Sequence, residues 1–171
     1  MNQKNRTKQK YRTVPSEDDW GNYQCDLDQE YAHKMFPSRT KEEMVQYFCD
    51  NPIMRTEDLY FMPEIPFRYY MIGYMEFMVD EGVDKGDEAS DAASCFLRLV
   101  LRKLENHPRH IMPIMPELLP AIDYVARNQN IFEASEKIYG SFVELRDQIT
   151  ALYESCGGIA YSDQLNAFLK K

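Results

Sequence analysis

Three side chains in one short segment have the types and spacing of a metal site. Glu30 and His33 stand three residues apart, as in the Glu-x-x-His pairs of metal-binding helical bundles, and Asp26 lies one turn before Glu30. On a helix the three side chains would share one face. A di-metal bundle needs a second such pair and further carboxylates from other helices, and the sequence has no second Glu-x-x-His. We therefore favour a solvated polar face and keep a metal-dependent helical-bundle enzyme as an alternative.

Other local patterns of catalysis or cofactor binding are missing from the sequence. His107 and His110 flank Pro108-Arg109 at the expected end of a helix, where imidazolium can interact with the terminal carbonyls. No cysteine lies in a nucleophile signature, and neither Gly-x-Ser-x-Gly nor a glycine-rich phosphate loop occurs. The sequence therefore favours a protein without enzymatic activity and without a cofactor.

The elements that carry these residues are predicted to be helices. Apolar residues recur at helical spacing, no strictly alternating strand stands out, and only 7 of 171 residues are glycine. Ser16 with Asp19, and Thr40 with Glu43, have the pattern of capping boxes. In the N-terminal half, the expected helices run from Ser16 to Pro37, from Thr40 to Asn51 and from Pro66 to Asp80, with a short helical or irregular piece from Thr56 to Met62. In the C-terminal half, a helix from Asp87 or Ser90 to about Asn106 is followed by a turn and by a further helix that ends at about Gln129. The last two expected helices run from about Glu136 to Cys156 and from Ser162 to Leu169.

Two of these helices have a clear apolar stripe. The stripe of the first predicted helix consists of Trp20, Tyr23, Leu27 and Tyr31. The stripe of the helix ending at Cys156 follows steps of four and three residues and is formed by Ile138, Phe142, Leu145, Ile149, Leu152 and Cys156.

One stretch is far richer in large apolar side chains than the rest. Residues 59–79 hold seven aromatic residues and four methionines. Apolar side chains cover nearly the whole circumference of the helix from Pro66 to Asp80, except for a polar strip in which Arg68, Glu76 and Asp80 share one face. Proline and charged residues within the stretch argue against a membrane span. We expect this helix to form the core. The alternative is an adaptor that binds a peptide against it, because methionine also lines adaptable binding surfaces.

The predicted fold class is all-α, a single-domain bundle of about six helices around the central aromatic and methionine-rich helix. We expect residues 1–15 to form a basic, disordered N-terminal arm and residues 16–171 to form the helical domain. No apolar segment of a secretion signal is visible at the N-terminus. We therefore expect a cytoplasmic protein with no membrane association, whose four scattered cysteines are thiols.

Charge is divided unevenly along the chain. The formal net charge is −8, although no acidic residue precedes Glu17. The first twelve residues instead hold five basic ones: Lys4, Arg6, Lys8, Lys10 and Arg12. The remaining 15 basic residues in 13–171 face 28 acidic ones, a balance of −13. Such a body repels phosphate backbones and attracts cationic partners, which argues against binding of nucleic acid.

The acidic residues gather in two segments, the first predicted helix and the break around Gly82 to Gly86. Acids early in helices are also stabilised by the helix dipole, so no partner is needed to explain them. A macromolecular partner, if the protein has one, is expected to be basic. The residues that we expect to face such a partner are Asp18, Asp19, Asp26, Asp28, Glu30, Asp80, Glu81, Asp84, Asp87 and Glu88.

The run Leu59-Tyr60-Phe61-Met62-Pro63, followed by Pro66-Phe67-Arg68-Tyr69-Tyr70, resembles a pattern of small, acidic, all-helical bacterial proteins. Some of these look like immunity proteins of polymorphic or contact-dependent toxin systems. The resemblance covers about Ser16 to Cys156 and brings no catalytic or binding residues with it. It implies a cytoplasmic protein that covers the active surface of a cognate toxin, often a nuclease with a basic cleft. We therefore expect a non-enzymatic binding protein with a basic toxin domain as its partner, the adaptor and the metal enzyme remaining as alternatives.

Overall fold

The computed structural model describes residues 11–159, and all the regular secondary structure in this range is helical. The predicted all-α class is therefore confirmed. Of the ten α-helices in residues 11–159, six have nine residues or more, so the expected number of about six fits only the longer helices. The elements are α2 (Glu17–Trp20), η1 (Tyr23–Cys25), α3 (Leu27–Met35), η2 (Glu42–Met44), α4 (Val45–Asp50), α5 (Pro52–Phe61), α6 (Glu64–Val79), α7 (Ala89–Asn106), α8 (Pro108–Ile111), α9 (Met115–Arg127), α10 (Glu136–Tyr139) and α11 (Phe142–Ser155).

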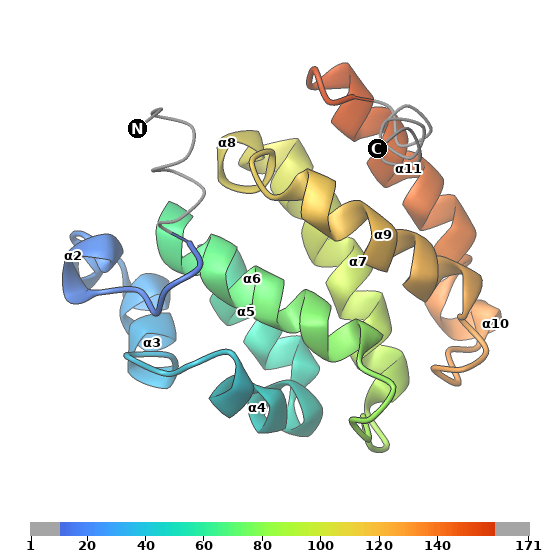
Figure 1. Ribbon diagram of the computed structural model, residues 1–171, viewed down its shortest axis with the longest axis horizontal. Coiled ribbons are helices and arrows are strands. Elements are labelled where there is room, and N and C mark those ends of the chain that lie inside the picture. The colour runs from blue at the N-terminus through green and yellow to red at the C-terminus, as the bar shows by residue number, and fades with distance from the viewer. Residues whose placement is uncertain (1–10, 160–171) are drawn as a thin grey trace, which may run out of the picture.

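Helix α6 lies in the middle of the molecule and contacts α2, α4 and α5 as well as α7, α8 and α9 (Figure 1). Eleven of its sixteen residues are buried. The tyrosine hydroxyls of this helix bond to the backbone of neighbouring segments, since Tyr70 donates to Phe36 and Arg39, Tyr74 donates to Ala92 and Tyr69 accepts from the N–H of Lys41. Burial of its aromatic and methionine side chains, which reaches 0% exposure at Phe67, Tyr70, Met71, Tyr74 and Met78, counts against a peptide-binding groove on this helix.

The residues of the polar strip on α6 do not act together. Arg68 is buried and donates hydrogen bonds to the backbone oxygens of α8. Glu76 forms an ion pair with Lys41, whose ammonium lies 2.6 Å from its carboxylate. Asp80 ends the helix and accepts a hydrogen bond from the backbone N–H of Gly82. Each polar residue therefore fixes a different neighbour of the central helix.

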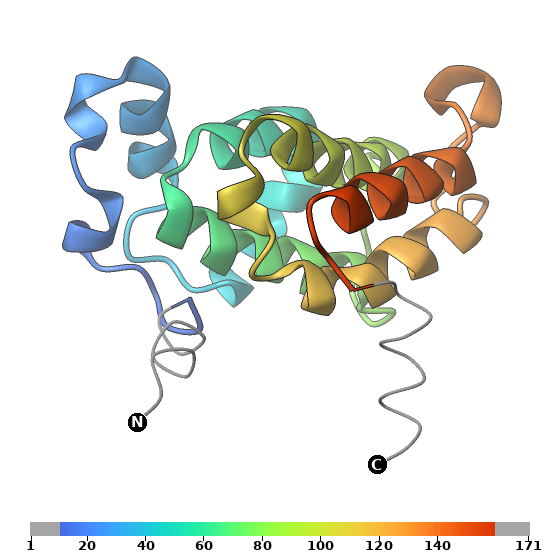
Figure 2. The same cartoon turned by 90° about the horizontal axis from the view of Figure 1, so that it is seen from above.

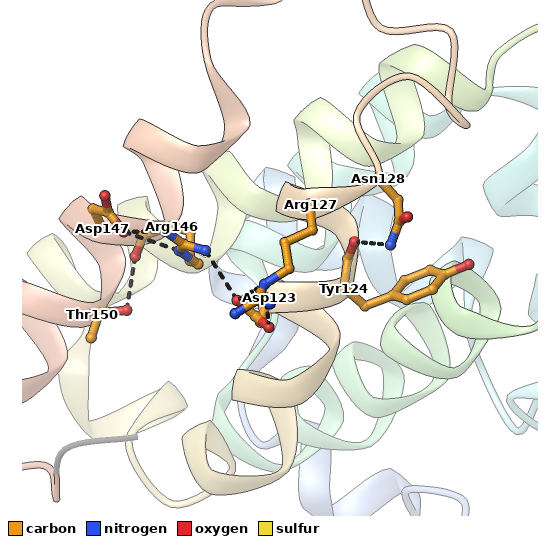
Figure 3. Close-up of polar contacts among 7 residues, drawn as sticks. All are labelled: Asp123, Tyr124, Arg127, Asn128, Arg146, Asp147 and Thr150. Atoms are coloured by element: carbon orange, nitrogen blue, oxygen red, sulfur yellow. Dashed lines mark hydrogen bonds and ion pairs between the residues drawn. The ribbon is translucent and has the colours of Figure 1, made fainter. Parts of the chain in front are cut away.

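Helix α11 packs against both α7 and α9, and these three helices make up most of the C-terminal half of the described chain (Figures 1 and 2). A network of charged side chains joins α9 to α11, because Asp123 accepts from Arg127 at 2.9 Å and from Arg146 at 3.1 Å (Figure 3). The ring of Tyr124, the next residue on α9, points away from this network (Figure 3). One side of α9 is thus fixed to α11, and the other carries Tyr124 toward the loop that follows α6.

The predicted helix from Ser16 to Pro37 is wrong, because the chain breaks twice within it. Gly21 has a left-handed φ of 60° and ends α2, and the carboxylate of Asp26 then accepts two backbone N–H groups to start α3. The apolar stripe predicted for this helix is interrupted at the same place. Trp20 is 2% exposed, whereas Leu27 and Tyr31 on α3 are 83% and 46% exposed.

The helix predicted to begin near Glu136 is also interrupted. Gly140 has a φ of 77° and separates the short α10 from α11, and the side chain of Ser141 caps α11 by accepting from the N–H of Glu144. Ile138 is consequently exposed, whereas Phe142 and Ile149 are buried as predicted. The predicted helix from Ser162 to Leu169 lies outside the described residues.

The capping box at Thr40 is confirmed, with the N–H of Thr40 donating to Glu43 at 2.7 Å and the N–H of Glu43 to the Thr40 hydroxyl at 3.3 Å. Asn51 ends α4, as expected, but its side chain also accepts from the N–H of Met54 and starts α5 at once. The piece from Thr56 to Met62 is therefore not irregular, because α5 continues to Phe61.

The described part of the predicted N-terminal arm packs against the helices. Tyr11 is 3% exposed and its hydroxyl donates to Glu117 on α9, and Arg12 lies 3.3 Å from the same carboxylate. Tyr11 and Pro15 are thus buried against the helices, although both lie in the range expected for the arm. Within residues 11–159 no helix combines the length and the apolar character that crossing a membrane requires.

Candidate functional site

The loop between α6 and α7 is shaped by its own acidic side chains. Asp80 accepts from the N–H of Gly82 at 2.8 Å, and Asp84 accepts from the N–H of Gly86 at 2.9 Å. The ammonium of Lys85 donates to the backbone oxygen of Asp80 at 2.7 Å and lies 5.6 Å from the ring centre of Phe77. Burial lowers the pKa of Lys85. The single cation of this loop therefore serves the loop itself.

A cleft of about 740 Å³ separates this loop from the turn that follows α9. Its apolar lining is contributed mainly by Tyr124, Ile131 and Phe132, of which Phe132 is buried and Ile131 is 62% exposed. Its charged lining consists of one cation, Lys85, and four acidic residues, Glu81, Asp84, Asp87 and Glu133. The cleft therefore offers apolar surface edged by carboxylates.

The negative charge of the cleft is compensated only in part, because Lys85 also lines it and interacts with the charges of Asp80, Glu81 and Asp84. In residues 11–159, the side chains of Glu81, Asp87 and Glu133 have no hydrogen bond or ion pair. The hydrogen bond between Glu88 and Asp91, beside the cleft, raises the pKa of Glu88, and the charges of Asp91 and Asp87 raise it further. Repulsion among these carboxylates would be relieved by a cation from outside.

The wall opposite the acidic loop is held in place by Gln129. Its amide nitrogen donates to the backbone oxygens of Ala134 and Gly140, both at 2.9 Å, and its amide oxygen accepts from the N–H of Phe142 at 2.9 Å. One side chain thus joins the turn after α9 to the start of α11. The geometry of the cleft is set before any partner arrives.

Glu133 occupies this wall in a left-handed conformation, with a φ of 52°. Such a conformation costs a non-glycine residue roughly 1–2 kcal/mol. Glycine avoids this strain, but part of the gain is offset because glycine increases the conformational entropy of the unfolded chain. We predict that Glu133→Gly stabilises the protein by about 0.5–1 kcal/mol in urea unfolding. Glu133→Ala is the matched control, because it removes the same charge and keeps the strain. Equal stability of the two variants would contradict a strained Glu133.

The ten acidic residues predicted to face a partner do not form one surface. The α2 and α3 segment lies beside the start of α6, whereas the acidic loop follows its end (Figure 1). A helix of that length spans about 24 Å. From the predicted set only Glu81, Asp84 and Asp87 line the cleft, with Glu88 next to them and Asp80 turned into the loop.

Most of the acids in α2 and α3 have local roles instead. Asp19 accepts from the N–H of Ser16 and completes a capping box, Asp26 caps α3, and Glu30 forms an ion pair with Lys34 at 3.1 Å. Asp28 is exposed, as is Asp18. The sequence reasoning thus took helix caps for parts of a binding surface.

The candidate metal ligands are not brought together. Asp26 caps α3, Glu30 pairs with Lys34, and the Nε2 of His33 lies 2.9 Å from the carboxylate of Glu17. The ring of His33 also stacks on Tyr23, with 3.8 Å between the ring centres. The described part of the chain contains no group of three His, Cys, Asp or Glu side chains that could hold a metal ion.

A buried amine lies beside the two histidines that the sequence placed at a helix end. Lys103 is 0% exposed, its Nζ lies 3.3 Å from the Nδ1 of His110 and 4.4 Å from the ring centre of Phe67, and no ion pair to it occurs in residues 11–159. Burial lowers the pKa of Lys103 to about 7 and that of His110 to about 4, and it also lowers the pKa of His107. Near neutral pH the histidines are therefore uncharged, and the expected imidazolium at the helix end is wrong. Full enclosure keeps Lys103 away from any substrate.

Sequence reasoning missed Lys103 and one whole wall of the cleft. Lys103 follows Val100 by three residues and therefore falls on the apolar face of its helix, a signal that was available. Tyr124, Ile131 and Glu133 had no such signal, because they meet the acidic loop only in the folded chain.

Comparison of the chain with known protein families, curated proteins and solved structures finds no match.

Proposed function

We propose that this protein is a non-enzymatic binding protein that neutralises a basic protein domain, in the manner of an immunity protein and its toxin. The observation that carries the proposal is the cleft between the α6–α7 loop and the turn after α9, which is edged by Glu81, Asp87 and Glu133, whose side chains form no hydrogen bond or ion pair with another described residue. A cationic side chain from the partner would enter between them.

The chemistry of the cleft fits lysine or arginine side chains of a protein better than a free cation. Carboxylates surround an apolar lining that includes the ring of Tyr124 and the exposed Ile131. Lysine and arginine have an apolar stem and a charged end, so they match both parts, and an arginine can also stack on a tyrosine ring. Interface centres are enriched in tyrosine and arginine for the same reasons.

The charge of the whole chain supports the same partner. Residues 13–171 have a balance of −13, which accelerates and orients the approach of a basic domain and repels nucleic acid. An inhibitor of a nuclease gains from this distribution, because it competes with a phosphate backbone for the same basic surface. The resemblance of the central helix motif to immunity proteins agrees with this reading.

The proposal is tested by protection of cells that produce a toxin domain encoded beside this chain. We expect the triple variant Glu81→Lys, Asp87→Lys and Glu133→Lys to lose protection. The matched control carries Asp18→Lys, Glu105→Lys and Glu154→Lys, which change the net charge equally at exposed positions away from the cleft. We expect the control to protect like the wild type. Equal protection by both variants, each shown by circular dichroism to be folded, would exclude the cleft as the binding site.

A further inference from the structure

A second surface, on the opposite part of the molecule, combines exposed apolar side chains with acids. Four of the nine large apolar residues exposed in the described chain belong to α3 and α5, namely Leu27, Tyr31, Ile53 and Met54. Between the two helices runs a groove of about 470 Å³. It is lined by Leu27, Asp28, Tyr31, Met54, Glu57, Asp58 and Phe61. Clusters of this kind mark interaction sites more often than single exposed apolar residues do.

Every charged residue that lines the α3–α5 groove is acidic. Glu57 already has a partner, because Arg102 donates to it at 2.5 Å. The side chain of Asp28 is exposed and forms no ion pair with any described residue. The groove therefore favours an occupant that is apolar and cationic.

Asp58 is a buried carboxylate in the wall of the groove whose hydrogen bonding is incomplete. Its Oδ2 lies 2.8 Å from the Nη1 of Arg55, yet the approach lacks hydrogen-bond geometry, and neither atom has another hydrogen-bond partner among the described residues. Its side chain is 5% exposed. Burial also raises the pKa of Asp58 to about 6, as expected for a carboxylate whose charge is poorly satisfied. Both atoms of this pair are enclosed, so the pair belongs to the wall beneath the groove and leaves Asp28 as the exposed acid of the groove that has no ion pair among the described residues.

We propose that the α3–α5 groove binds an amphipathic helix of a partner protein, with apolar residues at helical spacing against Leu27, Tyr31 and Met54 and a lysine or arginine directed at Asp28. A groove between two helices is a common receptor for such a helix. The inference does not rest on the acidic cleft, because the two surfaces share no residue.

The charges select a partner over a second copy of this chain as the occupant of the groove. A second copy of this chain would bring another body with a balance of −13, and like charges repel.

The proposal is tested with a synthetic helical peptide that carries leucines on one face and lysines on the other, measured by fluorescence anisotropy with the full chain. We expect binding that weakens at least tenfold in the variant Leu27→Ser and Tyr31→Ser. The control variant Ile138→Ser and Val143→Ser removes exposed apolar groups elsewhere and is expected to bind like the wild type. A peptide with glutamate in place of lysine is expected not to bind.

Three results would overturn the proposal. The first is that the groove variant binds the peptide as tightly as the wild type does. If the variant Glu81→Lys, Asp87→Lys and Glu133→Lys then loses affinity instead, the peptide binds in the acidic cleft. The second is self-association of the wild type in sedimentation velocity that the groove variant abolishes, because the occupant would then be a second copy. The third is displacement of the lysine peptide by a peptide of residues 160–171, which would make the chain its own ligand.

Discussion

Replacement of Lys103 by methionine is expected to stabilise the folded protein by about 2–4 kcal/mol at pH 7. The ammonium is fully buried against Phe67 and His110 without a carboxylate partner in the described chain, and burial lowers its pKa from 10.5 to about 7. A shift of that size corresponds to roughly 5 kcal/mol against the charged form. Methionine keeps the length of the side chain and its contacts with aromatic rings, and it loses one hydrogen bond.

The gain from Lys103→Met should depend on pH in a defined direction. Between pH 7 and 10.5 the unfolded chain binds a proton at Lys103 that the folded chain does not, so the stability of the wild type rises with pH through this window. Below pH 7 both states are protonated and the cost is complete. The lowered pKa of His110, about 4, makes stability increase with pH between about pH 4 and 6.5. The raised pKa of Asp58, about 6, has the opposite effect, because stability then decreases as pH increases between pH 3.8 and about 6. The substitution isolates Lys103 from both.

The measurement is urea unfolding of wild type and Lys103→Met at pH 6, 7 and 9. The difference should be largest at pH 6 and shrink by more than half at pH 9. Lys137→Met, on the exposed side of α10, is the control and should change stability by less than about 0.5 kcal/mol. A methionine variant that is less stable at pH 7 would show that the ammonium is well satisfied in the fold, and a gain independent of pH would show that folding does not lower the pKa of Lys103.

Replacement of Arg68 by methionine is expected to destabilise the protein by about 3–5 kcal/mol. Arg68 is 3% exposed, and its guanidinium donates to the backbone oxygens of His110 at 2.8 Å and Arg109 at 2.7 Å. These carbonyls belong to α8, which is too short to satisfy its own C-terminal carbonyls. Each buried group left unpaired costs about 1–3 kcal/mol. Glu64 would lose its ion pair as well.

Two further variants separate the role of Arg68 from its bulk and charge. Arg68→Lys keeps the charge but lacks the planar fork that reaches two carbonyls, so it should recover less than half of the lost stability in urea unfolding. Arg109→Met changes only an exposed side chain and leaves its backbone oxygen in place, so it should be nearly neutral. A loss below about 1 kcal/mol for Arg68→Met would mean that water replaces the guanidinium.

The fold class could be predicted because local signals agree with the packing in most helices. The apolar face of α7 ends at Asn106 as predicted, and the capping box at Thr40 forms. The interruptions at Gly21 and Gly140 were visible only as single glycines, which helices tolerate at a cost of about 1 kcal/mol. In both places a capping side chain, Asp26 or Ser141, begins a new helix and decides the outcome.

The candidate sites could be predicted only in part. The sequence shows where charged residues cluster, but it does not show which two loops face each other across a cleft in the folded chain. The acidic loop was identified with Glu81, Asp84 and Asp87, yet its opposite wall with Glu133 comes from a turn more than forty residues later. The same limit applies to the α3–α5 groove. Two of its apolar residues, Leu27 and Tyr31, are predicted to pack inward by a helical period that Gly21 interrupts.

The central claim is that Glu81, Asp87 and Glu133 bind a basic partner, and isothermal titration calorimetry with the purified toxin domain tests it most directly. We predict that the triple lysine variant of these residues binds at least 100-fold more weakly than the wild type. The control with Asp18→Lys, Glu105→Lys and Glu154→Lys should stay within about threefold, because a surface charge far from the interface is largely screened. If the two variants lose the same amount of affinity, the effect is due to the overall charge of the protein and not to the cleft. Unchanged affinity of the cleft variant would contradict the claim.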